Sequence, residues 1–538
     1  MVSALAVLAF LAPSPEVAAQ PQAPPGDPPR ILVSRFVVTG VSAFSQDPVQ
    51  ALLASGEGRE LTLAEIEGLA ARITALYRER GYILARAYVP AQEMRDGVVE
   101  IAVLEGRVAK IDINGLRHYN ADYLRRYVEP RSPKRVFEAG DFERGLLTLN
   151  DLPGLAVKST LRPGAETGTT DIVLDADKDR LITGALDANN YGSPETGYER
   201  FGVSLNLNNP LGLGDVLAFR GLTSTIGGAL WLARLSYAIP VNTLGTKVGA
   251  AYTHSHVGTD VGVVVGDITV RGDANIGSLY VLHPFVRSRE FSVYGQAGFD
   301  IKNFNNSFQS VPGAQPQHDD LRVASVGGFV DSVDRWLGAN NLSLTLSQGI
   351  GNFLGGMDGI NDPNASVPGA GGTFTKLTGD LSRSQQITTY TSIFLRLGGQ
   401  WASTSLVAPE QYIVGGQGTV RGYPVAQFSG DRGYALTGEF RWNAPGFGDK
   451  SAFLGKKWGD ILQFYAFIDH GGANLIKPPE GQTRSQTITG AGIGAQIAIQ
   501  DNFLLKLEYA KPLNNVVGGA TPSNGLDNYV YFLAVKWF

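Results

Sequence analysis

The sequence contains no cysteine and only three methionines among its 538 residues. Without cysteine, the chain has no disulfide framework, thiolate zinc site, iron–sulfur cluster or cysteine nucleophile. Charged residues make up 18% of the chain and the net charge is −5, which argues against a nucleic acid as partner. Beyond the N-terminus no apolar run approaches the roughly 18–20 residues that a membrane-spanning helix needs. A membrane protein of this composition would therefore have to be a closed β-barrel.

Sequence motifs of enzymes are also missing. There is no H-E-x-x-H, P-loop or G-x-S-x-G, and Gly416-Gln417-Gly418 lacks the third glycine of a dinucleotide fingerprint. His254-Ser255-His256 would place two imidazoles on one face of a strand, but no third ligand is apparent, so a loop or strand-end pair is favoured over a metal site. Asp319-Asp320 is expected to be solvated in a polar loop. We therefore predict that the protein is not an enzyme and uses no metal or cofactor.

The start of the chain has the outline of a secretory signal peptide over residues 1–19. This segment is mostly apolar and ends in the small-residue pattern Val17-Ala18-Ala19. The usual basic region is missing, since the first basic residue is Arg30, so a misassigned start and a disordered hydrophobic N-terminus stay open. Cleavage after Ala19 would leave a Pro-rich linker over residues 20–30. An exported chain without cysteine fits the oxidising periplasm or the outer membrane.

Residues 31–106 and 107–180 mix helix and strand signals in two units of about 75 residues each, large enough for one core apiece. In the first unit Thr62-Leu63-Ala64-Glu65 is a capping box, and apolar residues then recur at helical spacing. The second unit repeats the outline, with helical segments at 121–128 and 141–149 between strands. Three-stranded sheets of this kind leave edge strands open to an extended peptide, although a role as spacers is the alternative.

From residue 181 to residue 538 the helix signal gives way to long alternating strands, as where Leu342, Leu344 and Leu346 alternate with serine and threonine. Many of these strands run about ten residues, enough to cross a bilayer when tilted, whereas strands of soluble sheets average about 5–6. Our segmentation gives about sixteen strands, an even number as bacterial barrels have. The predicted fold class is therefore mixed, with two small α/β domains followed by a sixteen-stranded antiparallel transmembrane β-barrel.

The chain ends in a predicted strand, residues 528–538, whose last residue is aromatic. Outer-membrane barrels present a terminal aromatic residue to the machinery that assembles them, so we expect Phe538 to be the assembly signal. Lys536, two positions earlier, makes this signal imperfect.

A glycine-dense connection over about residues 405–432 carries one arginine and one aromatic residue in Val420-Arg421-Gly422-Tyr423. Such a loop can fold back into a wide lumen. In a later strand, Phe464 and every second residue after it are expected to face lipid. Phe467 and Asp469 occupy the alternate positions and are therefore expected to face the lumen. There Arg421 would find Asp469 as a charge-assisted partner, and the pair would hold the loop as a plug or latch. A mobile surface loop with an exposed arginine is the alternative, and spacing alone does not decide between them.

These residues resemble known motifs. Val420-Arg421-Gly422-Tyr423 and Phe467-Ile468-Asp469-His470-Gly471 resemble the V-R-G-Y and F-x-D-x-G motifs of the superfamily of outer-membrane barrels that carry POTRA domains. The N-terminal half resembles its two-partner-secretion branch, the hemolysin secretion/activation transporters, and the resemblance covers nearly the whole mature chain. The stretches that carry it are Leu61-Thr62-Leu63, Tyr77-Arg78-Glu79-Arg80-Gly81-Tyr82, Pro90-Ala91-Gln92, Asp96-Gly97-Val98-Val99, Leu104-Glu105-Gly106 and Leu149-Asn150-Asp151-Leu152-Pro153-Gly154.

The resemblance implies a barrel in the bacterial outer membrane and two periplasmic POTRA domains, residues 31–106 and 107–180. It implies secretion of one large partner exoprotein, whose N-terminal secretion domain binds the POTRA domains; whether that partner is also activated is left open. Contacts with the lipid bilayer and, during biogenesis, with the barrel-assembly machinery follow. It also implies functional roles for Val420, Arg421, Gly422 and Tyr423 of the loop and for Phe467, Asp469 and Gly471 of the strand, with Arg421 and Asp469 paired inside the barrel.

Two other functions stay open. A barrel-assembly factor, which inserts other barrel proteins, shares the V-R-G-Y loop, but two POTRA modules favour secretion over the longer arrays usual in such factors. A passive porin would explain the barrel but leaves residues 31–180 without a role. Some family members carry a plug helix before the first POTRA domain, and residues 20–30 are too short for one. We therefore expect that the helix is absent here, or that a wrong start codon has removed part of the N-terminus.

Overall fold

The computed structural model describes residues 29–130, 135–193, 196–225, 230–263, 266–309, 315–478, 480–514 and 528–538. The predicted signal peptide, residues 1–19, and all but the last two residues of the predicted linker lie outside this described part. The chain forms two compact units and passes from one to the other between Arg107 and Val108. In the described ranges, no helix has the length and apolar character needed to cross a membrane.

The first unit is a small α/β domain in which α1 (Asp47–Leu53) and α2 (Leu63–Glu79) pack on a sheet of order β2-β5-β4, while β1 pairs with β3. The strands are β1 (Arg30–Val33), β2 (Arg35–Thr39), β3 (Arg59–Thr62), β4 (Arg86–Tyr88) and β5 (Val98–Leu104), and the short helix η1 covers Ala54–Gly56. The predicted capping box starts α2, since the Glu65 amide donates to Thr62 Oγ1 at 3.3 Å and the Thr62 amide donates to the Glu65 carboxylate at 2.7 Å.

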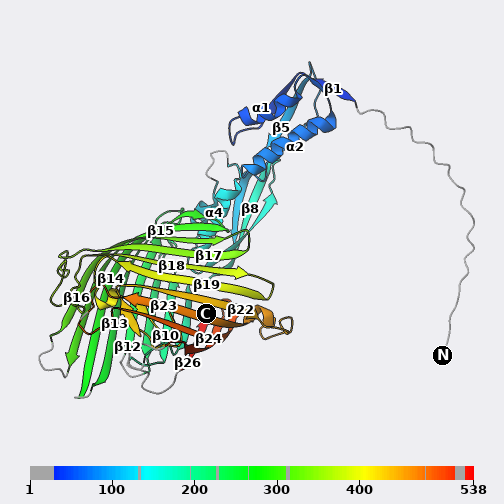
Figure 1. Cartoon of the computed structure of the whole chain (residues 1–538). Helices are drawn as coiled ribbons and strands as arrows, with labels where there is room; N and C mark the ends of the chain where they lie inside the picture. The colour runs from blue at the N-terminus through cyan, green and yellow to red at the C-terminus, as the bar shows by residue number, and fades with distance from the viewer. Residues whose placement is uncertain are drawn as a thin grey trace, which may run out of the picture. The chain divides into compact units, whose positions relative to one another are not determined.

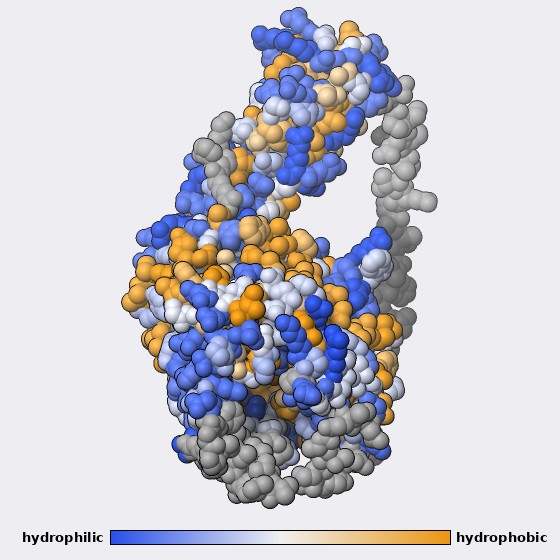
Figure 2. Space-filling model, turned by 60° about the vertical axis from the view of Figure 1, so that its left-hand side comes forward, coloured by the Kyte–Doolittle hydropathy of each residue, from blue (hydrophilic) through white to orange (hydrophobic). Residues whose placement is uncertain are grey.

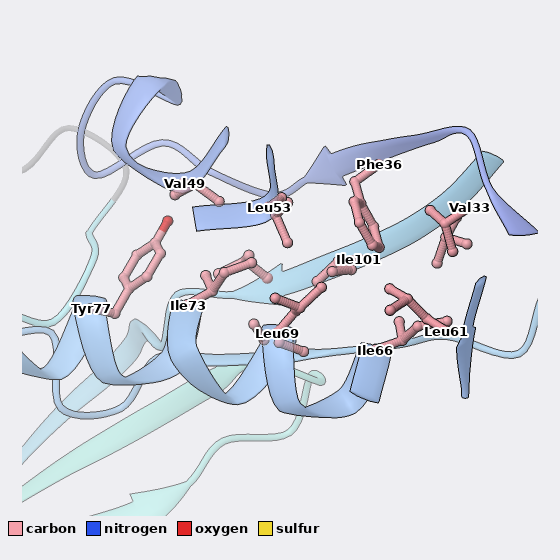
Figure 3. Close-up of a cluster of buried hydrophobic side chains, with 14 of the residues drawn as sticks. Val33, Phe36, Val49, Leu53, Leu61, Ile66, Leu69, Ile73, Tyr77 and Ile101 are labelled. Atoms are coloured by element: carbon pink, nitrogen blue, oxygen red, sulfur yellow. The ribbon is translucent and has the colours of Figure 1, made fainter. Parts of the chain in front are cut away.

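The core of this domain is formed by the apolar side of α2. Ile66, Ile73 and Tyr77 are fully buried and point from α2 into a cluster that includes Val49 of α1 and Ile101 of β5 (Figure 3). The Tyr77 hydroxyl donates to the Glu105 carboxylate at 2.9 Å. Burying such a helix face against a sheet supplies most of the stability of a domain this small.

Glu105, in the stretch Leu104-Glu105-Gly106, ties the first domain together. Its carboxylate accepts hydrogen bonds from the amides of Ser42 and Ala43, at 2.6 and 2.8 Å, and from the Ser42 and Tyr77 hydroxyls. Burial by itself raises the pKa of Glu105, but these hydrogen bonds favour the charged form more strongly, so the pKa lies below its ordinary value. The buried charge is therefore stable because four donors surround it.

The second unit begins with another small α/β domain. Its helices α3 (Ala121–Val128) and α4 (Ala139–Asn150) pack with a sheet of order β6-β8-β7, formed by β6 (Arg107–Asn114), β7 (Leu155–Pro163) and β8 (Thr169–Asp179). Helix α3 spans the residues predicted, and α4 begins two residues earlier than predicted. The Asn120 side chain caps α3 by accepting from the amides of Asp122 and Tyr123.

The described residues from 182 to 537 close into an antiparallel barrel of sixteen strands, in which the last strand pairs with the first (Figure 1). The predicted fold class is thus confirmed. The barrel strands are β9 (Ile182–Asn189), β10 (Arg200–Asn208), β11 (Val216–Ser224), β12 (Leu230–Pro240), β13 (Lys247–Val263), β14 (Gly266–Arg287), β15 (Phe291–Gln309), β16 (Gln317–Val333), β17 (Gly338–Gly349), β18 (Phe374–Gln386), β19 (Thr391–Ala402), β22 (Arg432–Asn443), β23 (Leu462–Asn474), β24 (Ser485–Ile499), β25 (Phe503–Pro512) and β26 (Tyr529–Trp537).

The wall of the barrel alternates as predicted. On β23, Ile468 is 54% exposed on the outer face, whereas its neighbour Asp469 is fully buried inside. On the face shown in Figure 2, hydrophobic residues gather in a broad belt over the barrel. The chain enters the barrel from the second α/β domain at the start of β9, and most connections at this end of the barrel are short turns. Longer connections, such as 350–373 and 403–431, lie at the opposite end. Barrels of the outer membrane show this asymmetry, with short turns facing the periplasm.

The sequence expectation for Asp319 is wrong. Asp319 was expected in a polar loop, but it lies within β16 and is only 1% exposed. Its Oδ1 atom accepts a hydrogen bond from the Ser366 amide at 2.9 Å. The connection 350–373 folds over this end of β16, with Met357 and Ala370 packed beside Leu321. Polar sequence there marks a strand that rises beyond the lipid rather than a loop.

Candidate functional site

The connection between β19 and β22, residues 403–431, folds into the lumen. It contains η2 (Ala408–Glu410) and a hairpin of β20 (Tyr412–Val414) with β21 (Phe428–Gly430). Val420 and Tyr423 are buried against Ala473 and Ile488 of the inner wall. Arg421 is 4% exposed. The loop is therefore packed inside the barrel, and the alternative of an exposed surface arginine does not hold.

Arg421 is bound on three sides by carboxylates of the wall. Its Nε and Nη2 atoms donate to the two oxygens of Asp469 at 2.7 and 2.9 Å, and its own amide donates to Asp469 at 3.1 Å. Its Nη1 atom donates to Glu508 at 2.6 Å and lies 3.0 Å from Glu439. The guanidinium stacks on the Phe467 ring, 3.4 Å from the centroid. This bidentate, stacked arrangement uses the planar shape of arginine as well as its charge.

The charges around Arg421 balance. Glu439 also pairs with Arg441 at 2.8 Å, and Glu508 also pairs with Lys506 at 3.1 Å. Among the described residues, this cluster therefore has three cations and three carboxylates. They are Arg421, Arg441 and Lys506, and Asp469, Glu439 and Glu508. Each of these side chains comes from an inward position of β22, β23 or β25, except Arg421, which the loop brings in. A buried cluster of this kind is stable only while every member keeps its partners.

Glycine residues in the wall make room for the loop. Gly490 of β24 lies directly opposite Asp469, and a Cβ atom there would come within 1.9 Å of the Arg421 carbonyl oxygen. At Gly471 a Cβ atom would meet Val420 Cγ2 at 2.9 Å. Gly422 has φ +93°, and a Cβ on it would press on the backbone of Lys511 at 2.8 Å. The glycines of both sequence motifs thus let the loop and the wall approach.

Tyr423 and Tyr531 fix the loop on the other side of Arg421. The Tyr423 hydroxyl lies 2.9 Å from the Thr489 carbonyl and 2.7 Å from the Asn514 carbonyl, to either of which it can donate. The Tyr531 hydroxyl accepts from the Gly422 amide at 3.2 Å. All four residues of the V-R-G-Y motif therefore contact the wall.

A second ion cluster, which the sequence did not reveal, holds the beginning of the loop. Glu410 of η2 is 4% exposed and binds Lys302 of β15, at 2.7 Å, and Lys376 of β18. Gln400 donates to its carbonyl at 3.0 Å. Asp431, at the end of the loop, accepts from the Leu406 and Ile476 amides at 2.8 and 2.7 Å. Lys302 and Lys376 lie at positions of their strands that face the lumen, so alternation could identify them. Nothing in the sequence of the loop identifies Glu410 as their partner.

The stretch Leu149-Asn150-Asp151-Leu152-Pro153-Gly154 joins the second α/β domain to the barrel. The Asp151 carboxylate accepts two hydrogen bonds from Arg287 at 2.8 and 2.9 Å, and its carbonyl accepts from Lys247 at 2.9 Å. Gly154 has φ +71°, and a Cβ there would lie 2.3 Å from the Arg180 carbonyl. The stretch is therefore tied to β13 and β14 of the barrel by side-chain hydrogen bonds.

Phe538 continues the pairing of the last strand. Its amide donates to the Gly184 carbonyl at 3.0 Å, and the Gly184 amide donates to the Phe538 carbonyl at 3.1 Å. The ring lies over Gly184 on the outer face and is 47% exposed. Phe538 is thus accessible at the rim of the barrel.

The two histidines considered as ligands were expected in a loop or at a strand end, but they lie in the middle of β13, because both are paired with β12 and β14. His254 and His256 face outward on β13, where their Nδ1 atoms lie 2.8 Å from Asn275 and Asp273 respectively. Within the part of the chain that the structure describes, no three His, Asp or Glu side chains gather as a metal ion would require.

Comparison with known proteins gives concordant matches. A family model described as haemolysin secretion/activation protein ShlB/FhaC/HecB matches residues 168–497, and one described as POTRA domain, ShlB-type, matches residues 31–106. The heme/hemopexin transporter protein HuxB of Haemophilus influenzae is 24% identical over 485 residues, which cover 88% of this chain and 82% of HuxB. The outer membrane transporter CdiB of Escherichia coli is 26% identical over 438 residues, covering 80% of this chain and 72% of CdiB.

Solved structures agree on the fold. The structure of CdiB from Escherichia coli has a TM-score of 0.76 at 22% identity, covering 98% of this chain and 94% of that one. BamA from Haemophilus ducreyi, lacking POTRA domains 1–3, has a TM-score of 0.51 at 15% identity, covering 95% of this chain and 100% of that one. The shared architecture is a set of small α/β domains followed by a barrel.

Proposed function

The chain belongs to the ShlB/FhaC/HecB haemolysin secretion/activation family and is an outer-membrane translocator for a partner exoprotein, and we propose that Arg421 holds a plug that must be released during export. The observation that carries the proposal is the buried bidentate pair of Arg421 with Asp469. In this proposal Phe467 stacks the guanidinium, while Gly471 and Gly422 let the loop approach, so the family motifs together form one latch.

The N-terminal domains lie in the periplasm, and we propose that they capture the partner. POTRA 1 is assigned to residues 31–106 and POTRA 2 to residues 107–180, with the barrel over 181–538. The match of a POTRA model to 31–106 and the end of β8 at Asp179 support these boundaries. In the sheet β6-β8-β7 the strands β6 and β7 are edges, to which the N-terminal secretion domain of a partner can add a strand.

Export through the lumen then requires the loop to move. With the loop in place, two ion clusters join it to the wall, one at Glu410 and one at Arg421. Passage of an extended chain would separate them, and water and the passing chain would replace the lost partners. No nucleotide fingerprint is present in the sequence, so folding of the partner outside the cell supplies the net direction. We infer that the protein acts as a transporter without catalytic chemistry.

The rival function, barrel assembly, has weaker support. The likeness to BamA is a likeness of fold alone at 15% identity, whereas the secretion family model matches residues 168–497. The chain itself does need such a machinery for its own insertion, and we propose that it recognises Phe538. The exposed ring at the rim supports this role. Phe538→Ser should lower the amount of inserted barrel without changing the activity of the inserted fraction.

Secretion by latch variants tests the proposal. The chain is co-expressed with its partner exoprotein, identified as an exported protein whose secretion depends on this chain, and the partner in the medium is quantified for Arg421→Ala and Asp469→Asn. We expect both to secrete several-fold less while the barrel stays inserted, as shown by heat-modifiable migration in gels. Arg234→Ala, which removes another inward arginine on β12, is the matched control. Normal secretion by both latch variants would reject the latch.

A further inference from the structure

A groove of about 890 Å³ crosses the outer wall of the barrel where its first and last strands meet. Its lining comes from β25, β26 and β9 to β12, whose outward residues lie in two rows of paired positions. The floor is made of small side chains, Ala188, Gly221, Thr223 and Ala534, and the sides of large apolar ones, Leu186, Phe201, Trp231, Phe503 and Leu505. The groove is therefore open to the membrane and apolar.

One end of the groove carries a positive charge. Lys536 of β26 lies directly opposite Phe503 of β25 on one side and Leu186 of β9 on the other, so the three residues form one row across the strands. Its side chain faces outward and lines the groove. Its ammonium donates to Asn502 Oδ1 at 2.7 Å, in the turn between β24 and β25. This turn lies at the periplasmic end of the barrel. The ammonium thus sits where the periplasmic leaflet has its head groups.

A periplasmic hairpin extends this end. The connection between β22 and β23, residues 444–461, is much longer than its neighbouring turns and includes α5 (Trp458–Ile461). Phe453 at its tip stacks on Phe503, with ring centroids 5.8 Å apart and planes 14° apart. Phe453 also packs on Trp458 at 5.8 Å. The hairpin therefore reaches across the outer wall as far as the groove.

The tip of this hairpin is apolar and its flanks are basic. Leu454 is 63% exposed and has φ +54°, a conformation that a branched side chain adopts at a cost and that turns usually give to Gly, Asn or Asp. Lys450, Lys456 and Lys457 are exposed around it. Lys457 lies 3.8 Å from Asp449, so the pair is loose. An exposed leucine held in this way, among lysines and beside the lipid-facing belt, is suited to a lipid surface.

We propose that this groove binds a glycerophospholipid of the periplasmic leaflet. An acyl chain lies over the small residues of the floor, Phe453 and Leu454 enter the leaflet beside it, and the phosphate is bound by Lys536 and the lysines of the hairpin. Charge complementarity selects an anionic head group, and the continuity of the groove with the lipid-facing belt selects an acyl chain over a soluble anion. The phosphates of lipopolysaccharide lie in the opposite leaflet, beyond the reach of these lysines.

The position of this site gives the lipid a structural role. Strand β26 pairs with β9 at five positions, whereas β9 pairs with β10 at eight. A lipid in the groove contacts both sides of the β26–β9 seam. Bound lipid should therefore raise the temperature at which the barrel loses heat-modifiable migration.

Native mass spectrometry of the detergent-purified full chain, titrated with phosphatidylglycerol, tests the proposal. We expect saturable binding of one lipid, weakened about tenfold or more by Lys536→Gln and by Lys456→Gln combined with Lys457→Gln. Ala534→Phe fills the floor and should weaken binding as well. Lys477→Gln, which removes an exposed lysine at the other end of the barrel, is the matched control and should bind as the unmodified chain does. Thr223→Leu fills the floor away from the seam and replaces Ala534→Phe if that variant does not insert.

Three results would overturn the site. Binding that falls with the lysine variants but not with either floor variant would show head-group attraction without a groove. Binding that none of the variants changes would place the lipid elsewhere on the barrel. Displacement of phosphatidylglycerol by an equal concentration of lipid A would assign the groove to the other leaflet.

Discussion

Replacing Arg421 by alanine should release the loop from the lumen, and the size of the effect follows from its partners. The guanidinium makes three charge-assisted hydrogen bonds of 2.6 to 2.9 Å. Removing one partner of a buried ion cluster costs about 3–5 kcal/mol, because the remaining charges keep the cost of burial without the attraction. Here Asp469, Glu439 and Glu508 are left facing one another. When the loop leaves, water reaches all three, so most of this free energy shifts the equilibrium toward the open state.

The change is large enough to see in single channels. Since about 1.4 kcal/mol corresponds to a factor of ten, 3 kcal/mol would raise the ratio of open to closed lumen by about 100-fold or more. Planar-bilayer recordings of the purified full chain measure this ratio as the fraction of time spent at high conductance. Asp469→Asn should act in the same direction but less strongly, because Glu508 and Glu439 still bind the arginine.

A double variant and a control sharpen the measurement. Arg421→Ala combined with Asp469→Ala should open the lumen less than the sum of the two single effects, because both remove the same interaction. Arg234→Ala removes an inward arginine of β12 that donates to Thr253 of β13, and it should leave the open fraction unchanged. If Arg421→Ala stays closed as often as this control, the guanidinium does not hold the plug and the reasoning is refuted.

Three further predictions concern other parts of the chain. Glu410→Gln removes the carboxylate that Lys302 and Lys376 share and leaves Lys302 only the distant Asp300, at 4.0 Å, so amide hydrogen exchange in β20 should accelerate severalfold while the open fraction rises less than in Arg421→Ala. The pKa of Glu105 is lowered in the folded domain, so the stability that its charged form contributes to the domain is complete above the ordinary pKa of glutamate, about 4.3, and is lost as the pH falls through the folded pKa. Below that pH the Ser42 and Ala43 amides should lose protection from hydrogen exchange. Glu105→Gln should flatten this pH dependence. Asp151→Ala removes the bidentate contact with Arg287, so spin-label distances between the second α/β domain and the barrel should broaden and secretion should fall. An unchanged distance distribution would show that this contact does not hold the domain to the barrel.

The sequence was most informative where lipid imposes a strict rule. Alternation places Phe467 and Asp469 inside because the neighbouring outward positions must be apolar in a bilayer. The rule fails once a strand rises above the lipid, as at His318-Asp319-Asp320 of β16, where consecutive polar residues hide the alternation and the pattern resembles a loop. Strands such as β14 (Gly266–Arg287) therefore extend well beyond what alternation predicts.

Contacts of the loop were predictable only in part. The pairing of Arg421 with a wall carboxylate rests on parity and a motif, but parity alone gives several inward acids, and the structure uses Glu439 and Glu508 as well. Glu410 lies in a loop without periodicity, so its partners depend on the course of the chain through the lumen. The groove on the outer wall has no linear signature, because its lining comes from six strands.

Withdrawal of the loop would leave a polarised duct. Arg421 and Glu410 belong to the same loop but neutralise charges on different parts of the inner wall. When the loop leaves, the net charge of both parts changes together. The sector around Asp469 becomes net negative, and the sector that bears Lys302 and Lys376 gains positive charge. A passing segment would then travel through a transverse electric field, in which oppositely charged side chains are drawn to opposite walls and the backbone is kept from collapsing on itself.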